Sequence, residues 1–270
     1  MKPLLFALLL FFSSTHSQQL EKRWETDSVV AVPESVLPDT QNGLLYVSLI
    51  DGNPWDADAK GGIARLKDDG TNYDSAWVKG LNAPKGLGLY KNHLYVADIS
   101  EVVVINTKTA QAEKRIPIPG ASGLNDITVT DEGIIYVSDS KTARIWRLEK
   151  EQPVLFLENM QGVNGLKAVG RELYIASGKS FVKADENKTI TKLAELPQPG
   201  DGIEPLGNGD FLASAWSGYI FYVSANGTVK TLLETSASKK NTADIGYDPV
   251  KKIVYVPTFF AKTVAAYQLK

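Results

Sequence analysis

The chain has 270 residues, and it contains no cysteine and only two histidines, His16 and His93. Without cysteine it cannot form disulfide bonds, thiolate metal sites or a thiol nucleophile. One of the two histidines falls in an N-terminal leader, and a single histidine cannot build the multi-histidine sites of zinc enzymes. The net charge of −2, with no basic run, makes nucleic acid an unsuitable partner. The remaining site chemistry is that of carboxylates, amides, hydroxyls and lysines.

Only one long apolar run is present, at Leu4–Phe12, directly after Lys2. This run is too short to span a bilayer and has the length of a signal-peptide core. The small residues around His16, ahead of Gln18, resemble a cleavage site. The sequence therefore predicts a signal peptide over residues 1–17. It also predicts a secreted or periplasmic mature protein with no membrane span after cleavage.

The rest of the chain repeats one pattern, which is clearest in Asp201–Val223. Short runs rich in aromatic and β-branched residues alternate with Asn-Gly and Gly-Asp turns, a pattern typical of consecutive antiparallel strands. Copies spaced by about forty residues, each with several strands, indicate a β-propeller. We expect an all-β, six-bladed propeller formed by one domain, residues 18–270. The repeat's second strand recurs as Leu45–Ser48, Leu94–Ala97, Ile135–Ser138, Leu173–Ala176, Phe211–Ser214 and Val254–Pro257.

The last copy of the repeat, from Asp244 to Lys270, has room for only three strands. The segment Arg23–Val32 is left over at the N-terminus of the mature chain and can supply the fourth, outer strand. Such a closure joins the two ends of the ring and removes an exposed sheet edge. The sequence therefore predicts a propeller closed by an N-terminal strand.

The innermost strand of each blade starts beside the central channel of a propeller, so its first residue points at a shared axial site. Three carboxylates and two amide oxygens in such a place make an oxygen-rich cage that suits Ca²⁺, although another divalent cation would also fit. Asn and Asp also start strands for reasons of turn geometry alone. Their recurrence in blade after blade favours the metal interpretation. The axial residues are Glu34, Lys85, Asn125, Asn164, Asp201 and Asp244.

The chain resembles the senescence marker protein/gluconolactonase/luciferin-regenerating-enzyme family of six-bladed propellers, and more distantly the paraoxonases. The resemblance implies that Glu34, Asn164 and Asp201 bind a catalytic divalent metal. It also implies that Asn125 is a further ligand or a contact for substrate or water, and that Asp201 doubles as the general base. The motifs that carry the resemblance are Pro33-Glu34 before Gly43-Leu44-Leu45-Tyr46, Asn125-Asp126, Asn164-Gly165-Leu166 and Asp201-Gly202.

The chain departs from this family's pattern at several positions. Gly123 stands where the sugar-lactone members carry an arginine, so a sugar-acid lactone is a poor fit as substrate. The histidine dyad of the paraoxonases has no counterpart, and Gly202 replaces their second amide ligand. For Lys85 and Asp244 two alternatives stay open, an axial salt bridge or a part in substrate binding and catalysis.

Aromatic residues occur in the loops expected above the axial site. Trp55 lies in the acidic loop Asp51–Gly62, and Trp216 and Phe259 lie in equivalent loops. Over a polar metal floor they would form a largely apolar substrate pocket. The alternative is that Trp216 and Phe259 pack between blades.

Two functions follow from the sequence. The first is hydrolysis of a lactone or related ester, with calcium polarising the carbonyl group and an axial carboxylate activating water. In this reading the partner is a small-molecule substrate. The second is a propeller that binds a ligand or a protein without turnover and keeps a structural metal.

Overall fold

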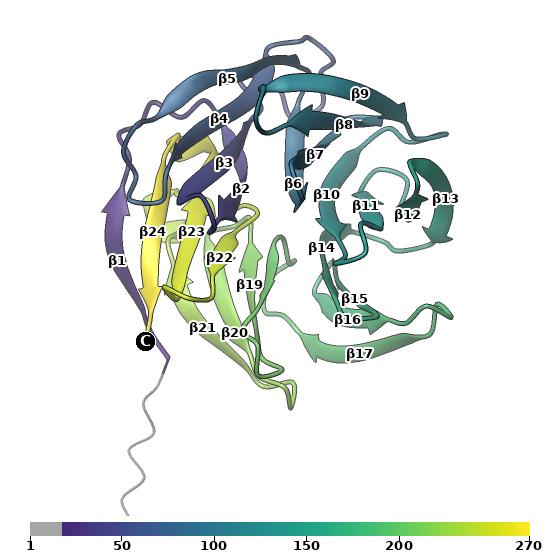
Figure 1. Cartoon of the computed structure of the whole chain (residues 1–270). Coiled ribbons are helices and arrows are strands. Elements are labelled where there is room, and N and C mark those ends of the chain that lie inside the picture. The colour runs from purple at the N-terminus through teal and green to yellow at the C-terminus, as the bar shows by residue number, and fades with distance from the viewer. Residues whose placement is uncertain (1–17) are drawn as a thin grey trace, which may run out of the picture.

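Each repeat folds into a four-stranded antiparallel sheet, and six such sheets form a ring (Figure 1). The structure, a computed structural model, describes residues 18–270, so the signal-peptide prediction for 1–17 lies outside the described residues. Strands follow one another in sequence within each blade, because short turns connect neighbouring antiparallel strands. The all-β, six-bladed propeller predicted from the repeats is confirmed.

The first five blades each consist of four consecutive strands, ordered from the channel outward. Blade 1 comprises β2 (Pro33–Asp39), β3 (Leu44–Leu49), β4 (Gly61–Lys67) and β5 (Asp74–Leu81). Blade 2 comprises β6 (Pro84–Tyr90), β7 (His93–Asp98), β8 (Glu101–Asn106) and β9 (Gln111–Pro117). Blade 3 comprises β10 (Leu124–Val129), β11 (Ile135–Asp139), β12 (Arg144–Glu149) and β13 (Gln152–Leu157). Blade 4 comprises β14 (Val163–Val169), β15 (Glu172–Ser177), β16 (Ser180–Ala184) and β17 (Ile190–Glu195). Blade 5 comprises β18 (Ile203–Pro205), β19 (Phe211–Ala215), β20 (Tyr219–Val223) and β21 (Val229–Glu234).

Blade 6 is closed by the N-terminus. Its inner three strands are β22 (Gly246–Asp248), β23 (Ile253–Pro257) and β24 (Val264–Leu269), and its outer strand is β1 (Leu20–Glu25). The closure is confirmed, but the strand lies earlier than the predicted Arg23–Val32.

The reason for this shift is that residues 26–32 cross from the outer edge of blade 6 to the innermost strand of blade 1. Val30 is fully buried on the way and donates its N–H to the carbonyl of Lys262. Val32 accepts from the N–H of Ile50 and so already belongs to blade 1. Val30 and Val32 are therefore buried in this connection and not in the closing strand.

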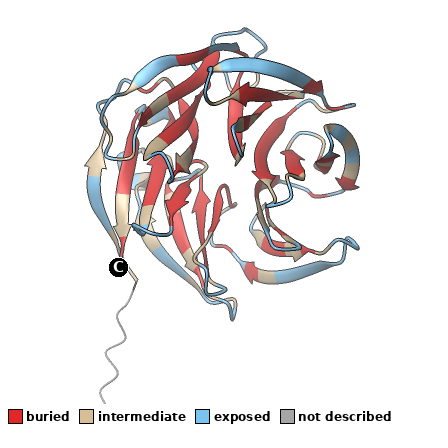
Figure 2. Cartoon of the chain, in the orientation of Figure 1, coloured by how far each residue is buried: buried red, intermediate tan, exposed pale blue. Residues whose placement is uncertain are grey.

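The core lies between neighbouring blades. One cluster, for example, joins Ala97 and Val102 of blade 2 to Leu124, Val137 and Trp146 of blade 3. Figure 2 shows the consequence: the strands near the channel are largely buried, and outer strands such as β9 and β17 are largely exposed.

Helical structure in residues 18–270 is limited to two single turns, η1 (Ser236–Ser238) and η2 (Phe259–Ala261). Neither could cross a membrane. Both lie in loops, and η2 carries two of the aromatic residues considered below.

Candidate metal centre in the central channel

The axial residues are turned toward the channel by a break in strand register. In blades 1, 3 and 4 the pairing of the two inner strands is interrupted around Glu34, Asn125 and Asn164. A bulge of this kind leaves the extra residue unpaired and redirects its side chain. The repeat therefore places the axial residues of these three blades by the same local device.

Serine side chains fix the backbone next to three of the axial residues. Each serine is the second-last residue of the second strand of its blade, and its hydroxyl oxygen accepts the N–H of the residue that follows the axial one. The distances are 2.8–2.9 Å. The sequence contained this signal, since serine is the last residue of the repeated second-strand pattern in three of the six copies. The pairs are Ser48 with Ser35, Ser138 with Asp126, and Ser214 with Gly202.

Gly165 allows blades 4 and 5 to approach each other closely at the site. A Cβ atom at this position would lie 1.7 Å from the carbonyl oxygen of Asp201. Only a residue without a side chain fits there. This contact brings the axial Asn164 and Asp201 together, and the amide of Asn164 hydrogen-bonds the Asp201 carboxyl group.

Two oxygen atoms at the centre of the site have no hydrogen-bond partner. They are Oε2 of Glu34 and Oδ1 of Asn164, and both are buried within the part of the chain that the structure describes. A buried polar atom left without a partner costs about 1–3 kcal/mol, so such atoms are rare and often point to an ion or water. Both atoms belong to the predicted ligand set, and a divalent cation would satisfy them.

The electrostatics of the site also favour a cation. Burial first, and then the charge of Asp201, raise the pKa of Glu34 well above its usual range. Burial, followed by the charge of Asp244, raises the pKa of Asp201 in the same way, and the hydrogen bond from Asn164 acts against this rise. Negative charge is therefore unfavourable here in the absence of a positive partner.

Asn125 completes the predicted set with its amide group fixed. Its Nδ2 donates to the hydroxyl of Ser140 at 3.0 Å, and that hydroxyl donates to the carbonyl of Val163 at 2.6 Å. The amide oxygen of Asn125 is thereby left as the free acceptor. Within residues 18–270 no three His, Cys, Asp or Glu side chains gather closely enough to hold a metal ion by themselves. A metal at the predicted site therefore depends on the amide oxygens of Asn125 and Asn164 as well as on the two carboxylates.

Asp244 lies further along the channel than the other predicted axial residues, at a position that we call the second level of the channel. Its backbone bonds to the carbonyl of Glu34 and the N–H of Val36, which aligns it with Ser35. The Ser35 hydroxyl donates to the Asp244 carboxylate, and burial raises the pKa of Asp244 to about 7. A Cβ at Gly202 would lie 2.4 Å from this carboxylate, so glycine at that position makes room for Asp244.

Asp126 shares this second level, and the prediction did not include it among the site residues. It is buried and accepts the N–H groups of Ile127 and Leu166 at 2.6 and 2.5 Å. Burial, with the charge of Asp244 next, raises the pKa of Asp126 well above its usual range. In the sequence, only its position directly after Asn125 indicated that Asp126 belongs to the site.

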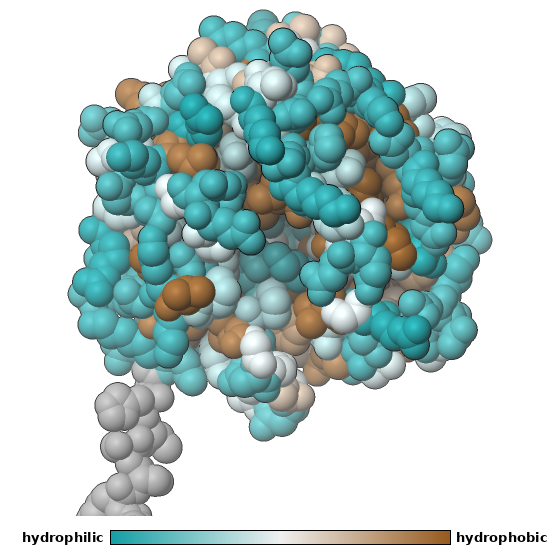
Figure 3. Space-filling view, viewed as in Figure 1, coloured by the Kyte–Doolittle hydropathy of each residue, from teal (hydrophilic) through white to brown (hydrophobic). Residues whose placement is uncertain are grey.

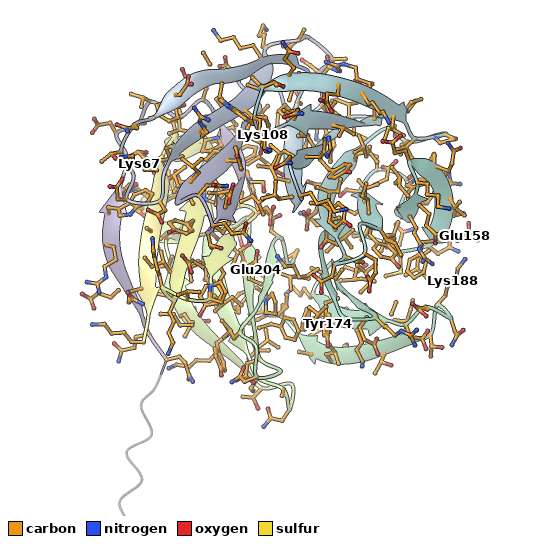
Figure 4. The ribbon with its side chains drawn as sticks, in the orientation of Figure 1. Lys67, Lys108, Glu158, Tyr174, Lys188 and Glu204 are labelled. Atoms are coloured by element: carbon orange, nitrogen blue, oxygen red, sulfur yellow. The ribbon has the colours of Figure 1, made fainter. Side chains whose placement is uncertain are left out.

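A cavity of about 270 Å³ continues along the channel from this second level. Ser35, Asp126 and Asp244 line one part of it, and the salt bridge between Lys167 and Glu204 (2.8 Å) lines another. Figure 3 shows the hollow at the centre of the ring with hydrophilic atoms at its floor, and Figure 4 shows Glu204 on the inner side of the ring. Glu34, Asn164 and Asp201 do not line this cavity, so the predicted metal centre is separate from it.

Lys85 does not pair with Asp244, which removes the salt-bridge alternative for these two residues. Its ammonium group donates instead to the carbonyls of Pro54 (2.6 Å) and Ala83 (3.1 Å). It also lies 4.2 Å from the centre of the Trp55 ring. Burial, opposed by the charge of Glu34, lowers the pKa of Lys85 to about 8. Lys85 thus anchors the loop that carries Trp55 beside the axial site.

The predicted aromatic residues form two separate groups. Trp55 lies with Lys85, whereas Trp216 contacts Phe259 and Phe260 with ring centres 5.5 and 5.9 Å apart. Phe259 is buried, consistent with the packing alternative, and the side chains of Trp216 and Phe260 are 43% and 60% exposed.

Gly123, where an arginine would have been expected from the resemblance, is covered by Lys141. A Cβ at Gly123 would lie 2.5 Å from Cγ of Lys141, and the ammonium group of Lys141 lies 4.5 Å from the centre of the Trp55 ring. The structure therefore places Lys141, which was not predicted as a site residue, at this edge of the site.

Comparison with known proteins establishes the fold. No protein-family profile matches the chain, and no curated protein sequence matches it significantly. Among solved structures, a catalytically inactive variant of virginiamycin B lyase from Staphylococcus aureus, solved with quinupristin, is similar. Its TM-score is 0.65 at 13% identity, over 94% of this chain and 99% of that one.

Two further structures are similar. A streptogramin B lyase has a TM-score of 0.64 at 9% identity, over 94% of this chain and 98% of its own. A chain of a nidogen/laminin complex has a TM-score of 0.63 at 14% identity, over 73% and 77%. These TM-scores support a shared propeller fold, and two of the three similar structures are those of lyases.

Proposed function

We propose that this propeller is a metal-dependent hydrolase of a lactone or related ester, exported from the cell by its N-terminal leader. The observation that carries the proposal is the pair of buried, unpartnered oxygens, Oε2 of Glu34 and Oδ1 of Asn164, beside the carboxyl group of Asp201. Oxygen ligands of this kind suit calcium, although another divalent cation would use the same atoms. The family resemblance of the sequence adds to this support.

Glu34, Asn164 and Asp201 would hold the metal, with Asn125 as a further ligand or as a contact for substrate or water. When bound, calcium would supply a Lewis acid for the carbonyl group and for the negative charge that develops on its oxygen. The burial of the site strengthens the electrostatic interactions within it, because water is largely excluded.

Asp201 would take the proton of the attacking water as the water oxygen bonds to the carbonyl carbon. The ester C–O bond then breaks, and the leaving oxygen takes this proton back from Asp201. A cation held by Asp201 would lower the pKa of that carboxyl group, so Asp201 would be a weak base. Most of the rate enhancement should therefore come from electrostatic stabilisation of the oxyanion.

A second function, binding without turnover, is favoured by one observation. Trp216 and Phe260 are exposed and in contact on a loop surface, as expected of residues that bind a partner. In that case the metal would have a structural role only.

A panel of lactones and esters, assayed with EDTA and with added calcium, separates the two functions. The hydrolase proposal expects turnover that EDTA abolishes and calcium restores. Asp201→Asn should reduce kcat severely even at saturating calcium, whereas Glu34→Gln should act mainly on calcium affinity and recover much of its turnover. Absence of hydrolysis across the panel with calcium bound would favour the binding function. Recovery of near-full kcat by Asp201→Asn would move the proton acceptor to Asp244.

A further inference from the structure

Three blades place their side chains at one point beside the metal centre. Trp55 comes from the β3–β4 loop of blade 1, Lys85 from the innermost strand of blade 2, and Lys141 from the β11–β12 turn of blade 3. The two ammonium groups lie 4.2 and 4.5 Å from the centre of the same indole ring. We refer to these three residues as the Trp55 cluster.

The two lysines of the Trp55 cluster repel each other. Burial is the main cause of the lowered pKa of Lys85, and the charge of Lys141 contributes to it. A tryptophan face attracts a cation, but it is neutral and does not cancel a second charge. The charges of Glu34 and Asp98 oppose this lowering of the Lys85 pKa. In residues 18–270, however, no carboxylate forms an ion pair with Lys85 or Lys141, so this arrangement favours the binding of an anion.

The ammonium group of Lys141 is free to bind such an anion. Within residues 18–270 its ammonium group makes no ion pair or hydrogen bond, and the side chain is exposed. Its aliphatic part lies against Gly123, where a Cβ would be only 2.5 Å from Cγ. The missing side chain at Gly123 thus lets Lys141 lie along the surface toward Trp55.

Lys85 supplies the buried part of the cluster. Lys85 is only 2% exposed, and its ammonium group donates two of its three hydrogens to the backbone carbonyls of Pro54 and Ala83. These bonds fix the position of the charge and leave one donor. The fixed, buried ammonium group of Lys85 next to the exposed ammonium group of Lys141 is well suited to a carboxylate, which accepts hydrogen bonds at both oxygens.

We propose that the Trp55 cluster binds a carboxylate carried by the substrate, with Lys85 and Lys141 as donors and the indole face against the substrate's apolar part. This proposal rests on the proposed function, and it narrows the substrate class to lactones or esters that bear a carboxylate. Lys141 is then a specificity-determining residue, remote from the bond that is broken.

The test has a binding arm that needs no turnover. Glutarate is titrated into the calcium-loaded protein while tryptophan fluorescence is recorded, and the Trp55→Phe variant identifies the part of the signal that comes from Trp55. We expect saturable binding in the wild type and at least about tenfold weaker binding in Lys141→Gln, the size expected when one charge-assisted hydrogen bond is lost. The control is Lys108→Gln, an exposed lysine in the β8–β9 turn (Figure 4), which should bind like the wild type.

The catalytic arm compares mono-(4-nitrophenyl) glutarate with its neutral methyl ester. Lys141→Gln should lower kcat/KM about tenfold for the charged ester through KM and leave the neutral ester unchanged, and Lys141→Glu should reverse the preference. Glutarate binding that depends on Lys141, without hydrolysis of either ester, would support the anion site and overturn the hydrolase. Hydrolysis of both esters at the same rate by wild type and Lys141→Gln, with no Lys141-dependent binding, would overturn the anion site alone.

Discussion

Glu34→Gln should stabilise the metal-free protein, although it removes a proposed metal ligand. The Glu34 carboxyl group is buried and one of its oxygens has no partner. Burial and the charges of three aspartates raise its pKa, and the charge of Lys85 acts against this rise. Glutamine keeps the shape of the side chain and removes the charge.

The size of the effect follows from proton linkage. The usual pKa of the group is 4.5, and the folded metal-free protein raises it well above that value. The native state therefore binds a proton more tightly than the unfolded chain does, which costs stability at pH values above 4.5. We expect Glu34→Gln to gain about 1–3 kcal/mol at pH 7, the size expected for a buried polar atom without a partner, or about 2–10 °C in Tm for a protein of this size. The gain should vanish as the pH falls below 4.5, because the carboxyl group of Glu34 is then protonated in both the folded protein and the unfolded chain.

Thermal unfolding in EDTA measures the stability of the metal-free protein, and thermal unfolding in excess calcium measures the effect of losing the metal ligand. Calcium at a hundredfold excess over its Kd should stabilise the wild type by about 2.7 kcal/mol and stabilise the variant far less. Glu204→Gln is the matched control, because Glu204 is equally buried but paired with Lys167. Removing the charge of Glu204 leaves the half-buried Lys167 without its ion-pair partner, so the control should be destabilised and keep its response to calcium. A Glu34→Gln variant that is less stable than the wild type in EDTA, with an unchanged response to calcium, would refute the reasoning.

Two further predictions concern the ring that holds the site. Gly165→Ala should lower stability by about 3 kcal/mol in thermal unfolding, because its Cβ would lie 1.7 Å from the Asp201 carbonyl oxygen. Gly52→Ala, in an exposed loop, should have little effect, and equal losses in the two variants would contradict the close contact. At the closing strand, burial would raise the pKa of Glu25, but hydrogen bonds from Lys22, Lys240 and Thr263 lower it to about 2. This depressed pKa stabilises the fold above pH 4.5 by about 1 kcal/mol after screening by solvent. The difference between wild type and Glu25→Gln should therefore shrink as the pH falls from 4.5 to 2, and a constant difference in urea unfolding would exclude this role.

Much of the fold could be predicted because the repeat is local. Alternation of strand and turn residues sets each blade, and the incomplete last copy requires a closing strand from elsewhere. The bounds of that strand could not be predicted, because the apolar residues around Val30 are equally suited to a buried connection. Only the packed ring distinguishes the two.

The sequence predicts which residues of the repeat face the channel, but it does not predict how far along the channel each of them lies. Glu34, Asn125 and Asn164 all occupy bulges at the start of an inner strand, which a repeat alignment can find. Asp244 lies one level lower, because its backbone pairs with blade 1 rather than following the pattern of the other blades. A sequence also does not show which distant side chains are in contact. Lys141 and Trp55 are 86 positions apart, so their contact could be found only in the structure.

The central claim is that Glu34, Asn125, Asn164 and Asp201 together hold one divalent cation. Calorimetric titration of calcium into the metal-free protein tests it most directly. The proposal expects one ion per chain in the wild type, at least about hundredfold weaker binding in Asn164→Leu, which removes one of the two unpartnered oxygens, and unchanged binding in Lys108→Gln. Absence of calcium binding in the wild type, or equal binding in Asn164→Leu, would contradict it.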